Sequence, residues 1–262
     1  MYEIYELTIF FLIGISIGSF LNVCIYRIPL KQSVVLPSSH CPNCKKSIPA
    51  YFNIPIISFI YLRGRCKFCK QAISIIYVIV EIFTGLFFLY FGYIYGISFD
   101  LLLIYFLIPI FIIIFFIDIK HLIIPDILIL LLFLICFLKV FISENTVIFP
   151  NFHNSIIGSL IAIFLIGGLI AFYYYVRKIE AMGLGDLKLF TTLGFIFGVK
   201  GILFIIIFSS IFGSILGSII LLKYKKNLKT ELPFGPYIIV ASFIYLIFAK
   251  DINEIIYTNI LF

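Results

Sequence analysis

The sequence predicts an all-α polytopic membrane protein with about eight transmembrane helices and a small cytoplasmic zinc-binding loop domain. Three observations favour this class. Hydrophobic residues make up 63% of the 262 residues and charged residues only 12%. Apolar runs of roughly 15 to 20 residues recur along the chain, which is typical of membrane-spanning helices. One long polar segment follows the first run and contains four of the six cysteines.

The first apolar run begins at Leu7 and has the acidic residues Glu3 and Glu6 before it. It has neither a basic leader nor a small-residue cleavage site, so we expect a retained helix and not a signal peptide. The sixth span is short, and we place its end near Lys200 and Gly201. The eight expected spans are 7–26, 73–92, 101–117, 127–142, 155–176, 187–199, 202–222 and 236–249.

The basic residues are distributed unevenly between the two predicted faces of the membrane. Sixteen of the nineteen lysines and arginines fall in the alternate connections 27–72, 118–126, 177–188 and 223–235. The positive-inside rule makes this face cytoplasmic and places both termini outside. The net charge of +7 is explained by these loops, so no nucleic-acid partner is expected. The predicted organisation is a first transmembrane helix (1–26), a cytoplasmic four-cysteine domain (27–72) and a transmembrane catalytic region (73–262).

The long connection contains two pairs of cysteines, each pair separated by two residues. The pairs are Cys41 with Cys44 and Cys66 with Cys69, and 21 residues lie between them. Two such pairs at this distance are typical of a tetrahedral four-thiolate zinc site, and a reducing cytoplasm disfavours disulfides. Because about 45 residues build little core of their own, a structural metal would stabilise the segment. We interpret Cys24 and Cys136, which lie within apolar runs, as core residues.

Acidic residues occur at or within the expected spans, where a charge is costly and therefore indicates function. Asp118 ends the third span and Asp186 begins the sixth at the same face, so their carboxylates could approach and share a proton. Such a pair could activate water and protonate a scissile amide. Two alternatives stay open at this stage. The acids could form structural ion pairs, Asp118 with Lys120 or His121 and Asp186 with Lys188, or they could relay protons in a transporter.

The segment "AMGLGDLKLF" places Gly183 and Gly185 immediately before Asp186. Glycines at these positions would let an extended substrate backbone come close to the carboxylate. We therefore expect Gly183, Gly185 and Lys188 to belong to a substrate-access loop.

Several motifs together resemble a known family. "GLGD" with a distant upstream aspartate resembles the GxGD class of intramembrane aspartic proteases. The whole set is similar to the type IV prepilin peptidases, which are bacterial leader peptidases and N-methyltransferases. The motifs in chain order are "GSFLNVCIYRIP", "PSSHCPNC", "NIPIISFIYLRGRCKFC", "ISIIYVIVE", "IDIKHLIIPD", "GLGDLK" and "LPFGPY". A presenilin-like protease would instead show Tyr-Asp upstream and Pro-Ala-Leu downstream.

The resemblance implies that Asp118 and Asp186 are the catalytic pair and that Asp126 is not, leaving it free to cap the following helix. It also implies the substrates, which are prepilins or pseudopilins of pili and secretion systems with short basic leaders, cleaved at the cytoplasmic face of the bacterial inner membrane. The methyl donor implied is S-adenosylmethionine, with Asn22, Arg27 and Glu81 as candidate residues, although no glycine-rich nucleotide fingerprint is present. The alternative function is a proton-coupled transporter, which would predict inverted repeats that the sequence does not show.

Overall fold

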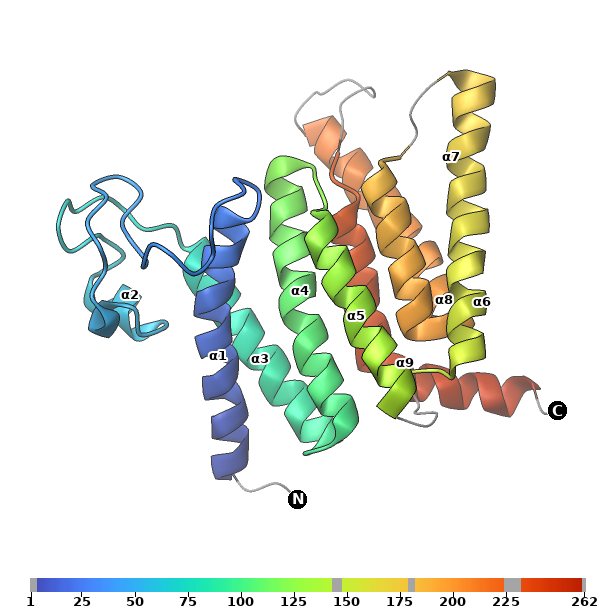
Figure 1. Ribbon diagram of the computed structural model, residues 1–262, viewed down its shortest axis with the longest axis horizontal. Helices are drawn as coiled ribbons and strands as arrows, with labels where there is room; N and C mark the ends of the chain where they lie inside the picture. The colour runs from blue at the N-terminus through green and yellow to red at the C-terminus, as the bar shows by residue number, and fades with distance from the viewer. Residues whose placement is uncertain (1–3, 143–147, 179–181, 224–231, 261–262) are drawn as a thin grey trace. The chain divides into compact units, whose positions relative to one another are not determined.

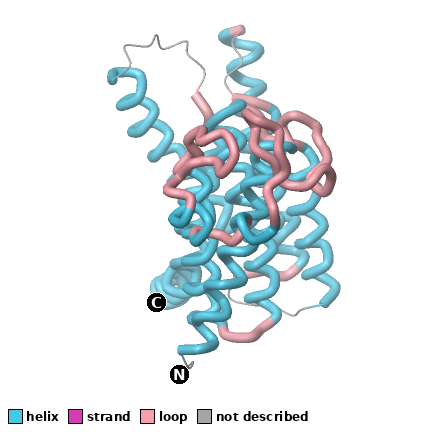
Figure 2. Tube along the Cα trace, turned by 90° about the vertical axis from the view of Figure 1, so that its left-hand side faces the viewer, coloured by secondary structure: helices cyan, strands magenta, loops and turns pink. Residues whose placement is uncertain are grey.

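The computed structural model describes residues 4–142, 148–178, 182–223 and 232–260 of the chain. Helices and loops account for all of these residues, apart from two isolated β-bridges, so the described chain contains no strand (Figure 2). This confirms the predicted all-α class. The chain forms two compact units, Met1–Ile113 and Ile114–Phe262, and each is described by itself. The division predicted from the sequence, into 1–26, 27–72 and 73–262, has other boundaries than these two units and stays a prediction.

The first unit is built on α1 (Ile4–Arg27), α3 (Ile76–Tyr95) and most of α4 (Phe99–His121). Helices α1 and α3 cross at glycines: a Cβ built on Gly14 would lie only 2.7 Å from the Cα of Gly85, and one on Gly18 equally close to the Cα of Glu81. Small residues allow such close backbone approach between membrane helices. Tyr105 of α4 stacks on Phe88 of α3 and donates a hydrogen bond to its carbonyl oxygen, at 2.7 Å.

The polar segment between α1 and α3 also belongs to the first unit. Apart from a single 3-10 turn, η1 (Ala50–Phe52), and the short α2 (Ile57–Tyr61), it consists of loops (Figure 1). Two hairpin turns within it have the same backbone pattern. The bridge His40–Ser47 closes one and the bridge Arg65–Ala72 closes the other. These turns carry the two cysteine pairs, so the sequence repeat corresponds to a structural repeat.

The second unit contains the end of α4 and the helices α5 (Asp126–Ile142), α6 (Phe152–Ala162), α7 (Gly168–Phe172), α8 (Leu184–Lys223) and α9 (Gly235–Ile260). The π-helical turns η2 (Ile163–Gly167) and η3 (Tyr173–Arg177) continue α6 and α7 as one long helix. Helices α6 and α8 cross at Gly158 and Gly194, where a Cβ on either residue would lie within 2.5 Å of the other's carbonyl oxygen. At this crossing the backbones of the two helices are in direct contact.

Helix α8 reverses direction at Gly198, which has φ 65° and ψ −165° and is not helical. A glycine tolerates this backbone conformation, whereas a side chain would meet the ring of Pro150 at 2.8 Å. The Asn154 side chain accepts a hydrogen bond from the Val199 N–H at 3.2 Å and so satisfies a donor freed by the break. Both ends of α8 consequently lie at the same end of the unit (Figure 1). The sequence predicts the end of the sixth span near Lys200 and Gly201, whereas the helix breaks two residues earlier, at Gly198.

Within the described residues, five helices are long and apolar enough to cross a membrane: α1, α3, α4, Phe152–Arg177 and α8. Two shorter apolar helices cover Asp126–Phe137 and Gly235–Ala249. The polytopic membrane character is therefore confirmed, while the count of eight spans stays a prediction. Of the basic connection 223–235, residues 224–231 lie outside the described part of the chain.

The crossing of α6 and α8 generates a first testable prediction. Gly194→Ala would place a Cβ 2.5 Å from the Gly158 carbonyl oxygen, so the helices must separate. We expect a loss of about 1–3 kcal/mol in unfolding free energy, the usual cost of overpacking. Gly168→Ala is the matched control, because a Cβ there meets nothing within 4 Å. Thermal unfolding in detergent measures both, and equal stability of the two variants would contradict the tight crossing.

Candidate functional site

The four cysteines of the polar segment come together at one point of the first unit. One sulfur atom from each of Cys41, Cys44, Cys66 and Cys69 lies within 4.8 Å of the other three. The sulfurs of Cys41 and Cys69 are 3.8 Å apart, and all four thiols are free. Tetrahedral Zn–S bonds of about 2.3 Å would place the sulfurs about 3.8 Å apart. The cluster could therefore hold one metal ion.

The surroundings favour the thiolate, the form in which cysteine binds metal, at Cys69, whereas burial and the neighbouring cysteine sulfurs raise the pKa of Cys44 to about 11. In each turn the first cysteine's carbonyl oxygen accepts a hydrogen bond from a lysine N–H, that of Lys45 or Lys70, and both lysines adopt positive φ. The Gln71 N–H beside the Cys69 sulfur lowers the pKa of that thiol to about 6. The Asn43 amide also donates to the Cys69 sulfur, at 3.8 Å. The metal-ligand geometry is thus built by local turns and not by a large core.

Asp118 lies near the end of α4 and is only 4% exposed. Its Oδ2 accepts a hydrogen bond of 2.9 Å from the backbone N–H of Gly235, the first residue of α9. Free N–H groups and the positive end of the helix dipole make a helix N-terminus a favourable partner for a carboxylate. A Cβ at Gly235 would lie 2.7 Å from the same oxygen, so the close approach requires glycine. The partner of this oxygen is thus the Gly235 N–H and not Lys120 or His121, the partners expected if Asp118 formed a structural ion pair.

Asp186 lies in the first turn of α8, in the same unit as Asp118. The backbone of Gly183 interacts with its carboxylate, and the charges of Asp186 and Asp118 are close enough to influence one another. Each aspartate therefore has a glycine backbone beside it, Gly183 for Asp186 and Gly235 for Asp118. The ends of α4, α8 and α9 thus bring the two acids within electrostatic reach of each other.

The loop that follows α4 and the beginning of α8 also contact each other directly. A Cβ at Gly185 would lie 3.3 Å from the Cβ of Ile124, so this glycine faces the neighbouring loop and not an open channel. Lys188 forms an ion pair of 2.7 Å with Asp126, the first residue of α5. The lysine is therefore paired with Asp126 and not with Asp186, and the pair connects the start of α5 to α8. Both side chains are more than half exposed, so the pair contributes little to stability.

Asn22, Arg27 and Glu81 are all buried in the first unit, and each binds main-chain groups. The Asn22 amide donates to the Tyr77 carbonyl oxygen at 3.1 Å and joins α1 to α3. Arg27 donates to the carbonyl oxygens of Ser33 and Ser38, at 2.9 and 3.4 Å.

Glu81 accepts a hydrogen bond of 2.8 Å from the N–H of Ile56, and the Ser19 hydroxyl also binds its carboxylate. Arg27 and Glu81 thus fasten the polar segment to α1 and α3. Their part in holding a methyl donor remains a prediction, because the contacts described are structural.

The arrangement around Asp118 and Asp186 can perform acid–base chemistry at a helix-bundle end. Two carboxylates within electrostatic reach do not both ionise freely, so one proton can be shared between them. The hydrogen bond from the Gly235 N–H to Asp118 could not be predicted from the sequence. The motif "LPFGPY" contains this glycine, but only the start of α9 shows which carboxylate its N–H reaches.

Two family models match successive parts of the chain. Residues 12–95 match the bacterial peptidase A24 N-terminal domain, and residues 105–218 match the type IV leader peptidase family. The first range contains the four cysteines, and the second contains both Asp118 and Asp186. No solved structure gives a significant match.

Curated relatives are similar over nearly the whole length. The prepilin leader peptidase/N-methyltransferase of Stutzerimonas stutzeri is 31% identical over 92% of this chain and 90% of its own. The protein of the same name from Legionella pneumophila is 32% identical, over 92% and 91%. That of Bacillus subtilis is 31% identical, over 94% and 96%. None of these matches supports the alternative of a proton-coupled transporter.

Proposed function

Because the chain belongs to the type IV leader peptidase family, we propose that it is an aspartic endopeptidase that removes the leader of prepilin-like proteins and then methylates the new N-terminus. One observation carries the peptidase part. The buried Asp118 carboxylate is held by the N–H of Gly235 while its charge reaches Asp186. That arrangement suits a pair of acids that act together on one bond.

In the proposed reaction one carboxylate takes a proton from water as the water oxygen attacks the carbonyl carbon of the scissile peptide. The other carboxylic acid donates its proton to the amide nitrogen as the carbon–nitrogen bond breaks. Gly235 keeps the Asp118 carboxyl group in place, and Gly183 does the same for Asp186. The ion pair between Lys188 and Asp126 joins the beginnings of α8 and α5 at the surface, where a substrate would enter.

The methyltransferase part rests on the names of the relatives. S-adenosylmethionine, when bound, supplies a methyl group that is reactive towards amines because it is carried on a sulfonium. The metal we propose is zinc in the four-cysteine cluster, where its role is structural because four thiolates leave no position for water.

We place the protein in the bacterial inner membrane with the aspartates and the polar segment on the cytoplasmic side and both termini outside. The excess of basic residues in alternate connections supports this orientation. Prepilins and pseudopilins, which carry basic leaders, are the substrates we expect there. Their apolar segments would reach the site from the lipid bilayer.

Asparagine substitutions test the aspartate pair. Asp118→Asn and Asp186→Asn should each lower leader removal by at least about 1,000-fold, because neither asparagine can transfer the proton. The measurement is cleavage of a purified prepilin, followed by mass analysis of the product. Asp126→Asn is the matched control, since this exposed acid lies in the same motif as Asp118 and should leave cleavage within a few-fold. Substantial cleavage by Asp118→Asn or Asp186→Asn, after excluding deamidation, would refute the assignment.

The backbone donor can be tested separately from the acids. Gly235→Ala would place a Cβ 2.7 Å from Asp118 Oδ2 and force the carboxylate to move. We expect leader removal to fall by about 10- to 100-fold, because small displacements of a reacting group are costly. Gly217→Ala is the control, as its nearest neighbour would lie at an ordinary 3.4 Å. Equal cleavage rates in the two variants would show that Asp118 does not depend on this contact.

Metal analysis tests the cysteine cluster. The purified protein should contain about one zinc ion per chain, and Cys41→Ser combined with Cys44→Ser should abolish it. Cys136→Ser is the control, because this buried thiol lies outside the cluster and should leave the zinc content unchanged. Plasma emission spectroscopy gives the metal content. A full complement of zinc in the double variant would rule out the four-thiolate site.

A further inference from the structure

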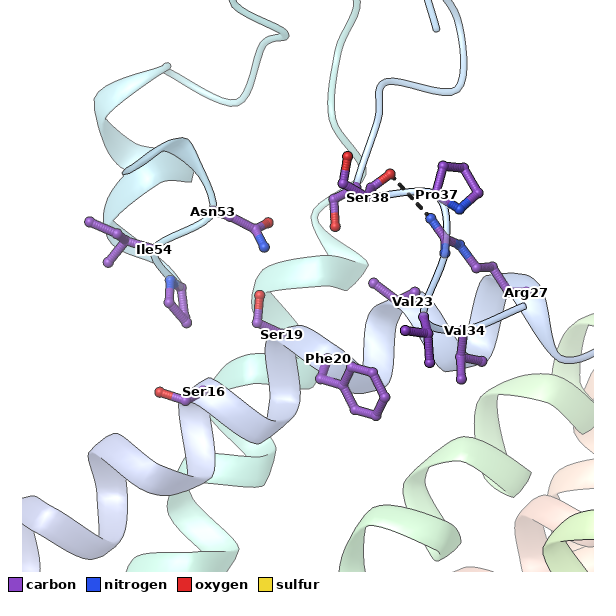
Figure 3. Close-up of a pocket in the computed structure, with 13 residues that line it drawn as sticks. Ser16, Ser19, Phe20, Val23, Arg27, Val34, Pro37, Ser38, Asn53 and Ile54 are labelled. Atoms are coloured by element: carbon purple, nitrogen blue, oxygen red, sulfur yellow. Dashed lines mark hydrogen bonds between the residues drawn. The ribbon is translucent and has the colours of Figure 1, made fainter. Parts of the chain in front are cut away.

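The first unit contains a cavity of about 610 Å³ between α1 and the polar segment (Figure 3). One wall is a single face of α1, formed by Ser16, Ser19, Phe20, Val23 and Arg27. The opposite wall consists of the loops 34–39 and 53–55. Cavities of roughly 300–1,000 Å³ are the size that holds small molecules and cofactors.

Helix periodicity separates this face of α1 from the one that packs against α3. Gly14 and Gly18 face α3 at backbone distance, whereas Ser16, Ser19 and Val23 face the cavity. In Figure 3 the Ser19 side chain points from α1 towards Asn53 of the opposite wall, whereas the Ser16 hydroxyl donates a hydrogen bond to the Leu12 carbonyl oxygen at 2.8 Å. Hydroxyl and amide groups therefore converge on the space, together with the apolar surfaces of Phe20 and Val23.

The two ends of the α1 wall differ in charge. Arg27 lies at one end, and although it binds two carbonyl oxygens, its guanidinium has five N–H donors. At the other end Ser19 lines the cavity while its hydroxyl binds the carboxylate of Glu81. Arg27 lies eight positions after Ser19 in α1, which corresponds to about 12 Å along the helix axis. The wall thus has a cation at Arg27, while the carboxylate of Glu81 lies behind Ser19 and outside the lining.

We propose that this cavity binds S-adenosylmethionine, an inference that rests on the methyltransferase part of the proposed function. The amino-acid end carries a carboxylate that Arg27 can bind. The sulfonium is a cation that the Glu81 carboxylate attracts through Ser19. The adenosine offers an aromatic ring for Phe20 and hydroxyl and amino groups for Asn53. A simple anion would use only Arg27, and an acyl chain would use neither charge.

The proposal revises the set of residues expected to hold the donor. Arg27 lines the cavity directly, but Asn22 and Glu81 are not part of its lining. Asn22 instead joins α1 to α3, and Glu81 acts from behind Ser19. The uncharged polar residues that line the cavity, and that we expect to contact the donor, are Ser16, Ser19 and Asn53. No glycine-rich nucleotide fold is needed, because the cavity is formed by a membrane helix and a metal-stabilised loop.

Calorimetric titration of the purified full-length protein with S-adenosylhomocysteine, the stable product of the donor, tests the site. Ser16→Phe places a ring in the cavity and should weaken binding by more than about 10-fold. Asn53→Leu removes the polar group at similar size and should weaken binding by about 5- to 10-fold. Ile9→Phe is the control, because this exposed residue lies two turns before Ser16 and outside the lining. It should bind as the unaltered protein does.

Circular dichroism of each variant shows whether it folds, and Asn53→Leu provides the test if Ser16→Phe does not. Unchanged affinity in the folded variants, with binding by the unaltered protein, would overturn this site and leave the methyltransferase function standing. If the unaltered protein removes leaders but binds no S-adenosylhomocysteine, the methyltransferase function and this site both fall. An equal loss in Ile9→Phe would also overturn the site, since the effect would not depend on the cavity.

Discussion

The cost of placing a carboxylate inside a helix bundle determines how the second unit is built. A buried carboxylate without partners costs several kcal/mol, and helix interiors have no free backbone donors to offset it. Donors are available where a helix begins. Asp118 meets such a donor at the start of α9, and Asp186 lies within the first turn of α8. The acids can therefore be buried together only at a bundle end where one helix stops and two others begin.

Glycines make this arrangement possible in three physically different ways. At Gly158 and Gly194 they allow two helices to approach at backbone distance. At Gly198 the residue adopts a positive φ that reverses α8 and returns its second half towards the aspartates' end. At Gly235 the missing side chain leaves space for a carboxylate oxygen. None of these positions could accept alanine without moving a neighbour or straining the backbone.

Residue spacing was sufficient to predict features that depend on local order or on the membrane. The four cysteines could be predicted to meet because two short turns repeat the same pattern, and Asp118 and Asp186 because both fall at the same predicted face. Contacts between distant segments were not predictable in this way. The partner of Lys188 is set by how the loops before α5 and α8 pack, 62 positions apart in the chain. The break at Gly198 likewise depends on Pro150 and Asn154, which belong to another element.

The polar segment of the first unit is held at few points, and this explains why polar side chains occur in the helices beside it. The cysteine cluster joins its two turns, Arg27 binds its beginning at Ser33 and Ser38, and Glu81 binds the N–H of Ile56. Ile56 has positive φ, which is costly for a branched residue, so an anchor at this position has a clear physical purpose. Because the cavity lies between these anchors, its shape depends on the cluster and on α1 together. A metal-free segment would keep Arg27 and Glu81 in place but would lose the constraint that connects its two turns.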